Sequence, residues 1–92
     1  MAVEIRVPRI LRQHVGGASF LTAQAGLLKE ILAVVTADHP GLRQQLMANG
    51  EELHRFINVY VNDEDVRFLE GLETKVSDGD VVAILPAVAG GN

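Results

Sequence analysis

The chain has 92 residues, of which 48% are hydrophobic, and a formal net charge of −4. This length allows one small domain with a single core, and the hydrophobic content excludes an intrinsically disordered chain. Because Lys and Arg are dispersed and outnumbered, the charge argues against a nucleic-acid-binding surface and favours a basic protein partner.

Cysteine is absent from the sequence. The chain therefore has no disulfide, no thiolate metal site and no nucleophilic thiol of its own. It also has no long apolar run and no charged leader followed by a hydrophobic segment, so we expect a cytoplasmic protein.

The N-terminal part of the chain predicts a β-hairpin. From Val3 to Val7 apolar residues alternate with polar ones, which is the period of a half-buried strand, and Pro8 closes it. Residues 9–17 form a long connection that contains two glycines, and residues 18–23 are predicted as the second strand.

A helix is predicted next, from about Gly26 to Asp38, where the hydrophobic period changes. Its apolar face consists of Leu28, Ile31, Leu32 and Val35, and its polar face of Lys29, Glu30 and Thr36. No good N-cap residue precedes it, and residues 39–41, His-Pro-Gly, end it. One further helical turn is indicated by the spacing of Leu42, Leu46 and Met47.

The second half of the chain predicts short strands joined by polar turns. Residues 56–61 form a strand with Ile57, Val59 and Val61 on one side. Residues 62–65 are interpreted as a solvated turn that leads to a short strand at 66–68; they are not an EF-hand loop, which needs a glycine where Phe68 stands. Residues 69–76 are expected to wrap the sheet edge. Residues 78–80, Asp-Gly-Asp, then form a turn in which Gly79 takes a positive φ.

The last strand is the organising element of the prediction. Residues 81–86 are apolar and β-branched in part, which favours a strand buried on both faces, and Pro86 removes a donor and stops the ladder. If this strand pairs with the first one, it lies in the middle of the sheet. The prediction is an α+β fold of the β-grasp (ubiquitin-like) type, a mixed sheet around one main helix.

The domain is predicted to span residues 1–86 and to end in a flexible Gly-Gly tail, residues 87–92. The six residues 86–91 would reach about 20 Å if fully extended.

The run Ile84-Leu85-Pro86-Ala87-Val88-Ala89-Gly90-Gly91, preceded by residues 78–80, resembles the ending of the ubiquitin-like sulfur carriers. This MoaD/ThiS-type family includes the small subunit of molybdopterin synthase, the thiamine-pathway carrier and the actinobacterial cysteine-synthesis carrier. The resemblance to the last extends through residues 53–68.

The resemblance implies a sulfur carrier protein that is not an enzyme by itself. The carboxylate of Gly91 would be adenylated with ATP and converted to a thiocarboxylate, while Gly90, Ala89 and Val88 thread into the partner's channel. Glycine suits that position because a Cβ would crowd the approach of the carboxylate to the α-phosphate. Because the resemblance extends furthest to the cysteine-synthesis carrier, it implies that the sulfur is donated for cysteine biosynthesis.

The resemblance also implies partners. They are an E1-like adenylyltransferase/sulfurtransferase, a sulfur-accepting enzyme such as a pyridoxal-phosphate-dependent cysteine synthase, and a metallopeptidase that trims the tail or releases cysteine. ATP and pyridoxal phosphate would belong to these enzymes, and the carrier itself would hold no cofactor. Neither nucleic acid nor membrane is an expected partner.

The roles of several side chains have two possible interpretations. Asn92 follows Gly91, so either a peptidase removes it or it is an addition to the natural chain. Leu85 and Phe68 are predicted to pack inside; if exposed near the tail, they would form an apolar docking patch for the activating enzyme. The three histidines, His14, His39 and His54, are far apart and are interpreted as surface residues without a metal site.

Three alternatives to cysteine synthesis stay open. The sulfur could serve thiosugar, thiamine or molybdopterin synthesis. The chain could be the small subunit of a synthase, with its tail inserted in a larger subunit, or a ubiquitin-like modifier conjugated through Gly91. An isopeptide-linked ladder would favour the modifier, and a free thiocarboxylate the carrier.

Overall fold

A computed structural model of the chain describes residues 2–48 and 52–86. The elements in this part are β1 (Val3–Arg6), the 3₁₀ helix η1 (Arg9–Val15), β2 (Phe20–Ala23), β3 (Gly26–Leu27), α1 (Leu28–Asp38), α2 (Pro40–Leu46), β4 (Met47–Ala48), β5 (Glu52–Leu53), β6 (Ile57–Val61), β7 (Glu64–Asp65), the 3₁₀ helices η2 (Val66–Phe68) and η3 (Gly71–Glu73), β8 (Lys75–Val76) and β9 (Val81–Pro86).

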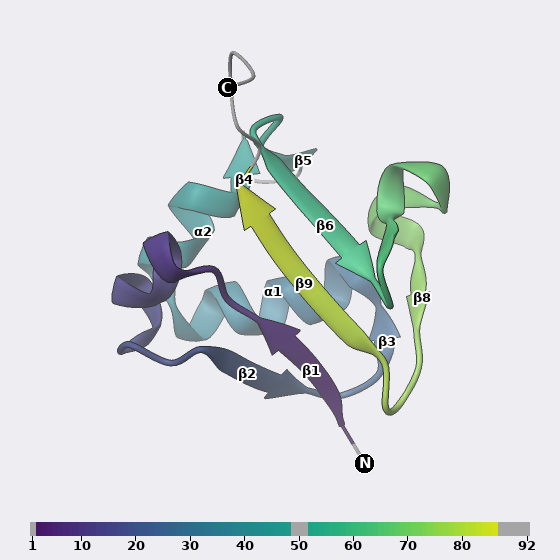
Figure 1. The fold of residues 1–92 in the computed structure, drawn as a ribbon, viewed down its shortest axis with the longest axis horizontal. Coiled ribbons are helices and arrows are strands. Elements are labelled where there is room, and N and C mark those ends of the chain that lie inside the picture. The colour runs from purple at the N-terminus through teal and green to yellow at the C-terminus, as the bar shows by residue number, and fades with distance from the viewer. Residues whose placement is uncertain (1, 49–51, 87–92) are drawn as a thin grey trace.

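The main sheet has the strand order β2-β1-β9-β6-β7, so the last strand lies in its middle (Figure 1). β9 runs parallel to β1 and antiparallel to β6, and β1 and β2 form the predicted antiparallel hairpin. Helix α1 crosses one face of the sheet. The predicted β-grasp fold with a central C-terminal strand is confirmed.

The core forms between α1 and the inner face of the sheet. The predicted apolar face of α1 is buried, as are the alternating residues of β1, β6 and β9: Leu28, Ile31, Leu32, Val35, Val3, Ile5, Val59, Val61, Val82 and Ile84. Each fully buried side chain of this size contributes about 1.5–3 kcal/mol relative to an exposed one. The helical period of α1 and the alternation in β1 therefore identified their core positions correctly.

Thr36 is buried as well, with 6% of its surface exposed, and its predicted outward position was wrong. Its Oγ1 donates a hydrogen bond of 2.7 Å to the carbonyl of Leu32 in the preceding turn. Because the helix itself satisfies the hydroxyl, the rest of the side chain can pack like an apolar one.

The helix boundaries follow the sequence with two differences. At the start of α1, Leu27 cannot cap through its side chain, and the Glu30 carboxylate accepts a 3.0 Å hydrogen bond from the Leu27 N–H instead. After α1 ends at Asp38, α2 begins at once with proline in its first turn. Met47 belongs to β4 and not to this helix, so its predicted helical position was wrong.

Burial on both faces of β9 was also a wrong prediction. Val82 and Ile84 are buried on the inner face, whereas 45% of the Leu85 surface is exposed on the outer face, which no layer of helices covers. Pro86 pairs with Ile57 and stays in the ladder. The bond from the Asn62 N–H to the Val81 carbonyl sets the register, so Pro86 falls where β9 donates no hydrogen bond to β6.

The short strand was predicted to begin two residues too late, because a tight turn precedes it. Asn62 and Asp63 have φ values of 51° and 72°, typical of a type I′ hairpin turn, and the strand follows at Glu64–Asp65. Residues 66–68 form η2. The predicted positive φ of Gly79 is confirmed at 89°.

Asp65 was predicted in a solvated turn, but its side chain is only 8% exposed. It caps η2 by accepting a 2.9 Å hydrogen bond from the Arg67 N–H, and it accepts a 2.7 Å bond from the Arg67 guanidinium. These donors lower the pKa of the Asp65 carboxyl below its usual value near 3.8. The ionised form is therefore the stabilising one.

Replacing Asp65 by Asn is expected to lower the free energy of unfolding at pH 7 by about 1 kcal/mol, since Arg67 is largely exposed and its charge is screened. Because the folded pKa is depressed, the contribution is complete above the unfolded pKa and is lost as the pH falls through the folded one. Urea unfolding at pH 7 and near pH 2.5 measures this difference. The Asp63→Asn control should leave the gap between the two pH values unchanged; an equal change in both variants would contradict the assignment.

Candidate functional site

The sheet face opposite α1 is uncovered, and we call it the open sheet face (Figure 1). Strand alternation and register place on it Glu4, Arg6, Phe20, Thr22, Asn58, Tyr60, Val81, Ala83 and Leu85. Leu85 and Phe20 have 45% and 52% of their surface exposed, and Arg6 pairs with Glu4 at 2.8 Å. This face offers apolar surface with a polar surround, which suits protein docking.

A second feature is a groove at the end of β9, where the C-terminal tail is attached; we call it the root groove. It holds about 240 Å³ and is lined by Ile10, Leu11, Gln44, Gln45, His54, Phe56, Ile57 and Pro86. Of these, Ile10 and Phe56 are exposed by 62% and 43%. The Arg55 guanidinium lies 5.1 Å from the centre of the Phe56 ring, so the aromatic edge of the groove carries a cation.

The root groove was not predicted from the sequence, because η1, α2 and the start of β6 come together only in the folded chain. Alternation could have indicated the exposure of Phe20, since Leu21 and Ala23 face inward on the same strand. No comparable period marks Ile10, which lies in a 3₁₀ helix where the sequence predicted a plain connection.

The two predicted docking residues are both exposed, which contradicts the prediction that they pack inside. They do not form one patch, however. Leu85 pairs with Asn58 at the start of β6, whereas Phe68, with 84% of its surface exposed, lines a hollow with Val61 and Asn62 at the opposite end. Roughly 10 Å of strand separates the two ends.

The predicted tail residues Val88, Ala89, Gly90, Gly91 and Asn92 lie outside the described residues. What the structure places is their point of attachment. Pro86 continues the central strand, whose inner residues Val82 and Ile84 are 0% and 1% exposed. The tail therefore begins from a strand that is paired on both sides and buried on its inner face.

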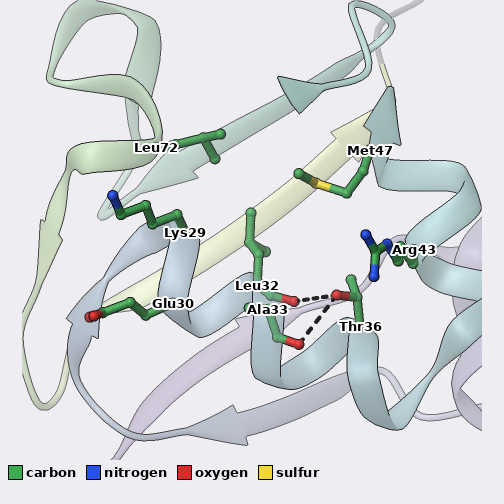
Figure 2. A pocket seen from close by; sticks show the side chains of 8 residues that line it. All are labelled: Lys29, Glu30, Leu32, Ala33, Thr36, Arg43, Met47 and Leu72. Carbon is green, nitrogen blue, oxygen red and sulfur yellow. Dashed lines mark hydrogen bonds between the residues drawn. The ribbon is translucent and has the colours of Figure 1, made fainter. Parts of the chain in front are cut away.

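A hollow of about 400 Å³ lies between α1, α2, β4 and the turn at Leu72 (Figure 2). Its polar groups on α1 already have partners: Lys29 pairs with Glu73 at 2.8 Å, Thr36 donates to Leu32, and Glu30 accepts from Leu27. The rest of the lining consists of Arg43 and the side chains of Leu32, Ala33, Met47 and Leu72. The polar side chains that line the hollow are therefore engaged in interactions within the chain.

The histidines are dispersed, as predicted. The Nδ1 atom of His54 accepts a 3.2 Å hydrogen bond from the Phe56 N–H, and the His14 ring packs against Gly41. Within residues 2–48 and 52–86, no three His, Asp or Glu side chains are grouped to hold a metal ion. No helix of this part is long and apolar enough to cross a membrane.

Comparison with known proteins identifies the family. The ThiS family matches residues 5–91. The chain is 47% identical over 93 residues to the sulfur carrier protein CysO of Mycobacterium tuberculosis, covering 99% of this chain and 100% of that protein.

Solved structures give the same result. A chain in the crystal structure of the Amycolatopsis orientalis BexX/CysO complex matches with a TM-score of 0.89 and 53% identity, over 98% of this chain and 100% of that one. The small archaeal modifier protein 1 of Methanosarcina acetivorans matches with a TM-score of 0.85 and 31% identity, over 98% and 96%. The chain therefore belongs to the ThiS family of ubiquitin-like sulfur carrier proteins.

Proposed function

We propose that the chain carries sulfur as a thiocarboxylate on Gly91. The observation that carries this proposal is the family match through residue 91, joined to a strand order that anchors the tail in the middle of the sheet. A rigid anchor with a thin, glycine-ended extension suits delivery of a main-chain carboxylate into a partner's narrow active site.

The chemistry needs two steps. The Gly91 carboxylate attacks the α-phosphate of ATP, forming an acyl-adenylate and releasing pyrophosphate. Hydrosulfide, or sulfide released from a persulfide by a thiol reductant, then attacks the acyl carbon and expels AMP, leaving the thiocarboxylate and one proton. The chain supplies the acceptor carboxylate, while an E1-like partner supplies ATP binding and the catalytic groups.

The open sheet face and the root groove are the surfaces that we assign to docking of this activating enzyme. Leu85 lies beside the root of the tail and faces outward, so a partner that draws in Val88, Ala89 and Gly90 must pass over it. Phe68, at the far end of β6, would have at most a peripheral part.

Because the chain supplies the carboxylate and the partner the catalytic groups, we do not assign enzyme activity to the chain.

Cysteine biosynthesis is the sulfur pathway that we propose, on the similarity to CysO. A pyridoxal-phosphate-dependent cysteine synthase would accept the sulfur, and a metallopeptidase would release cysteine from the tail. Supply to a thiosugar, thiamine or molybdopterin pathway uses the same tail chemistry and is distinguished by the accepting enzyme.

The test is intact mass spectrometry of the 91-residue form after incubation with ATP, an E1-like activating enzyme and sulfide. We expect a mass increase equal to exchange of one oxygen for sulfur, located by digestion to the C-terminal peptide. Omission of ATP should abolish it. Formation of the adenylate without sulfur transfer, or sulfur on an internal residue, would contradict the proposal.

A modifier function is the second candidate, favoured by the similarity to the small archaeal modifier protein 1. In that case a lysine amine of a target would capture the adenylate and expel AMP. Isopeptide-linked conjugates that disappear when Gly91 is deleted would support it, and their absence beside abundant thiocarboxylate would exclude it.

A further inference from the structure

The outer edge of β2 is free to pair with another strand. β2 is the terminal strand of the main sheet and pairs only with β1 in the part of the chain that the structure describes. Its sequence, Phe20-Leu21-Thr22-Ala23, has no charge and no proline, the usual devices that keep another strand from adding. Phe and Thr are also good strand formers.

The register shows which backbone groups point outward. The N–H of Val7 donates to the Ser19 carbonyl, so Leu21 and Ala23 occupy the hydrogen-bonded positions opposite β1. The N–H and C=O groups of Phe20 and Thr22 therefore face away from the sheet. An incoming extended segment would find two donors and two acceptors spaced for pairing.

Apolar side chains lie on both faces of this edge. Phe20 is 52% exposed on the open sheet face. On the other face is α1, whose Val34 is 60% exposed; its helical position is on the Ile31 side, opposite the Lys29 and Thr36 side that borders the hollow in Figure 2. An added strand would cover both side chains, which now meet water.

On the α1 side the charge beside the edge is negative, whereas Arg6 and Glu4 of β1, which lie opposite Phe20 and Thr22, pair with each other at 2.8 Å. The exposed residues around Val34 on α1 are Glu30, Ala37 and Asp38, and β2 itself is uncharged. A second copy of the chain added at this edge would bring two acidic rims together, which is unfavourable. A partner segment with Lys or Arg is complementary in charge to these acidic residues.

We propose that the outer edge of β2 is a strand-addition site for an extended partner segment that alternates apolar and basic residues. Main-chain hydrogen bonds to Phe20 and Thr22 would give affinity, and contacts with Val34 and Asp38 would give specificity. β1 separates this edge from β9, so the site leaves the root of the tail accessible. It does not depend on the chemistry at Gly91.

The probe is a synthetic seven-residue peptide, acetyl-Val-Lys-Val-Arg-Val-Lys-Val-amide, added to the ¹⁵N-labelled chain. In the free chain the amides of Phe20 and Thr22 should exchange with solvent quickly, and those of Leu21 and Ala23 slowly. Saturation with the peptide should slow exchange at Phe20 and Thr22 at least tenfold. A peptide with Glu in place of Lys and Arg should bind at least about tenfold more weakly.

Thr22→Pro removes one outward N–H that the sheet does not use, which an edge strand tolerates, and should abolish binding. The matched Thr22→Val variant keeps the N–H and should bind normally. Asp38→Lys should weaken binding about tenfold, while Glu64→Lys, with the same change of charge on β7, should leave it within about twofold. The last pair tests the site even if the proline variant does not fold.

Unchanged exchange at Phe20 and Thr22 in the saturated complex would overturn the proposal, as would equal binding by the acidic and basic peptides. Protection of these amides that grows with chain concentration without peptide would assign the edge to self-association instead. None of these results bears on sulfur loading at Gly91, which intact mass measures separately.

Discussion

The chain that ends at Gly91 is expected to accept sulfur at least about 100-fold faster than the chain that retains Asn92. Adenylation requires in-line attack of a carboxylate oxygen on the α-phosphate, and a displacement of about 1 Å can cost two orders of magnitude in rate. One added residue moves the carboxylate by more than 3 Å along an extended chain. Asn92 also adds a branched side chain next to the reacting atoms.

Intact mass after incubation with ATP, activating enzyme and sulfide measures loading of both forms at equal concentration. An Asn92→Ala chain is the matched control and should be as inactive as the Asn92 form, since the extra residue and not its amide is the obstacle. Sulfur on the intact Asn92 chain, at a rate within tenfold of the shorter form, would contradict the requirement for a terminal Gly91.

Local periods in the sequence were enough to predict most of the fold. The strand alternation of β1 and β6 and the helical period of α1 arise because one face of each element must be buried, and the buried residues are those predicted. The central place of β9 was predicted on the condition that it pairs with the first strand, and its lack of charged residues suited that position.

Two of the errors, at Thr36 and Asp65, arose where side-chain hydrogen bonds override polarity. Thr36 and Asp65 are polar by composition, but a helix carbonyl satisfies the one and the Arg67 donors satisfy the other, so both can be buried. Neither partner follows from a hydrophobic period. The candidate site had the same limit, because the separation of Leu85 from Phe68 depends on which ends of β6 they reach.

Replacing Ile84 by Ala is expected to lower the free energy of unfolding by about 2–4 kcal/mol. Ile84 is 1% exposed and lies in the middle of β9, so the truncation leaves a cavity between the sheet and α1. For a domain of this size the melting temperature should fall by about 10–25 °C. Thermal unfolding followed by circular dichroism measures the change.

Leu85→Ala changes the adjacent residue of the same strand and should have the opposite profile. With 45% of its surface exposed, Leu85 should contribute less than about 1 kcal/mol to stability. Loading is compared at a temperature where both variants are folded. Leu85→Ala should then slow sulfur loading by the activating enzyme about tenfold, whereas the Ile84→Ala chain should be loaded at the rate of the unmodified chain. Phe68→Ala removes an equally apolar but distant side chain and is the control. If Leu85→Ala and Phe68→Ala slow loading equally, docking extends along the whole of β6; if neither slows it, recognition rests on the tail alone and the open sheet face has no part in it.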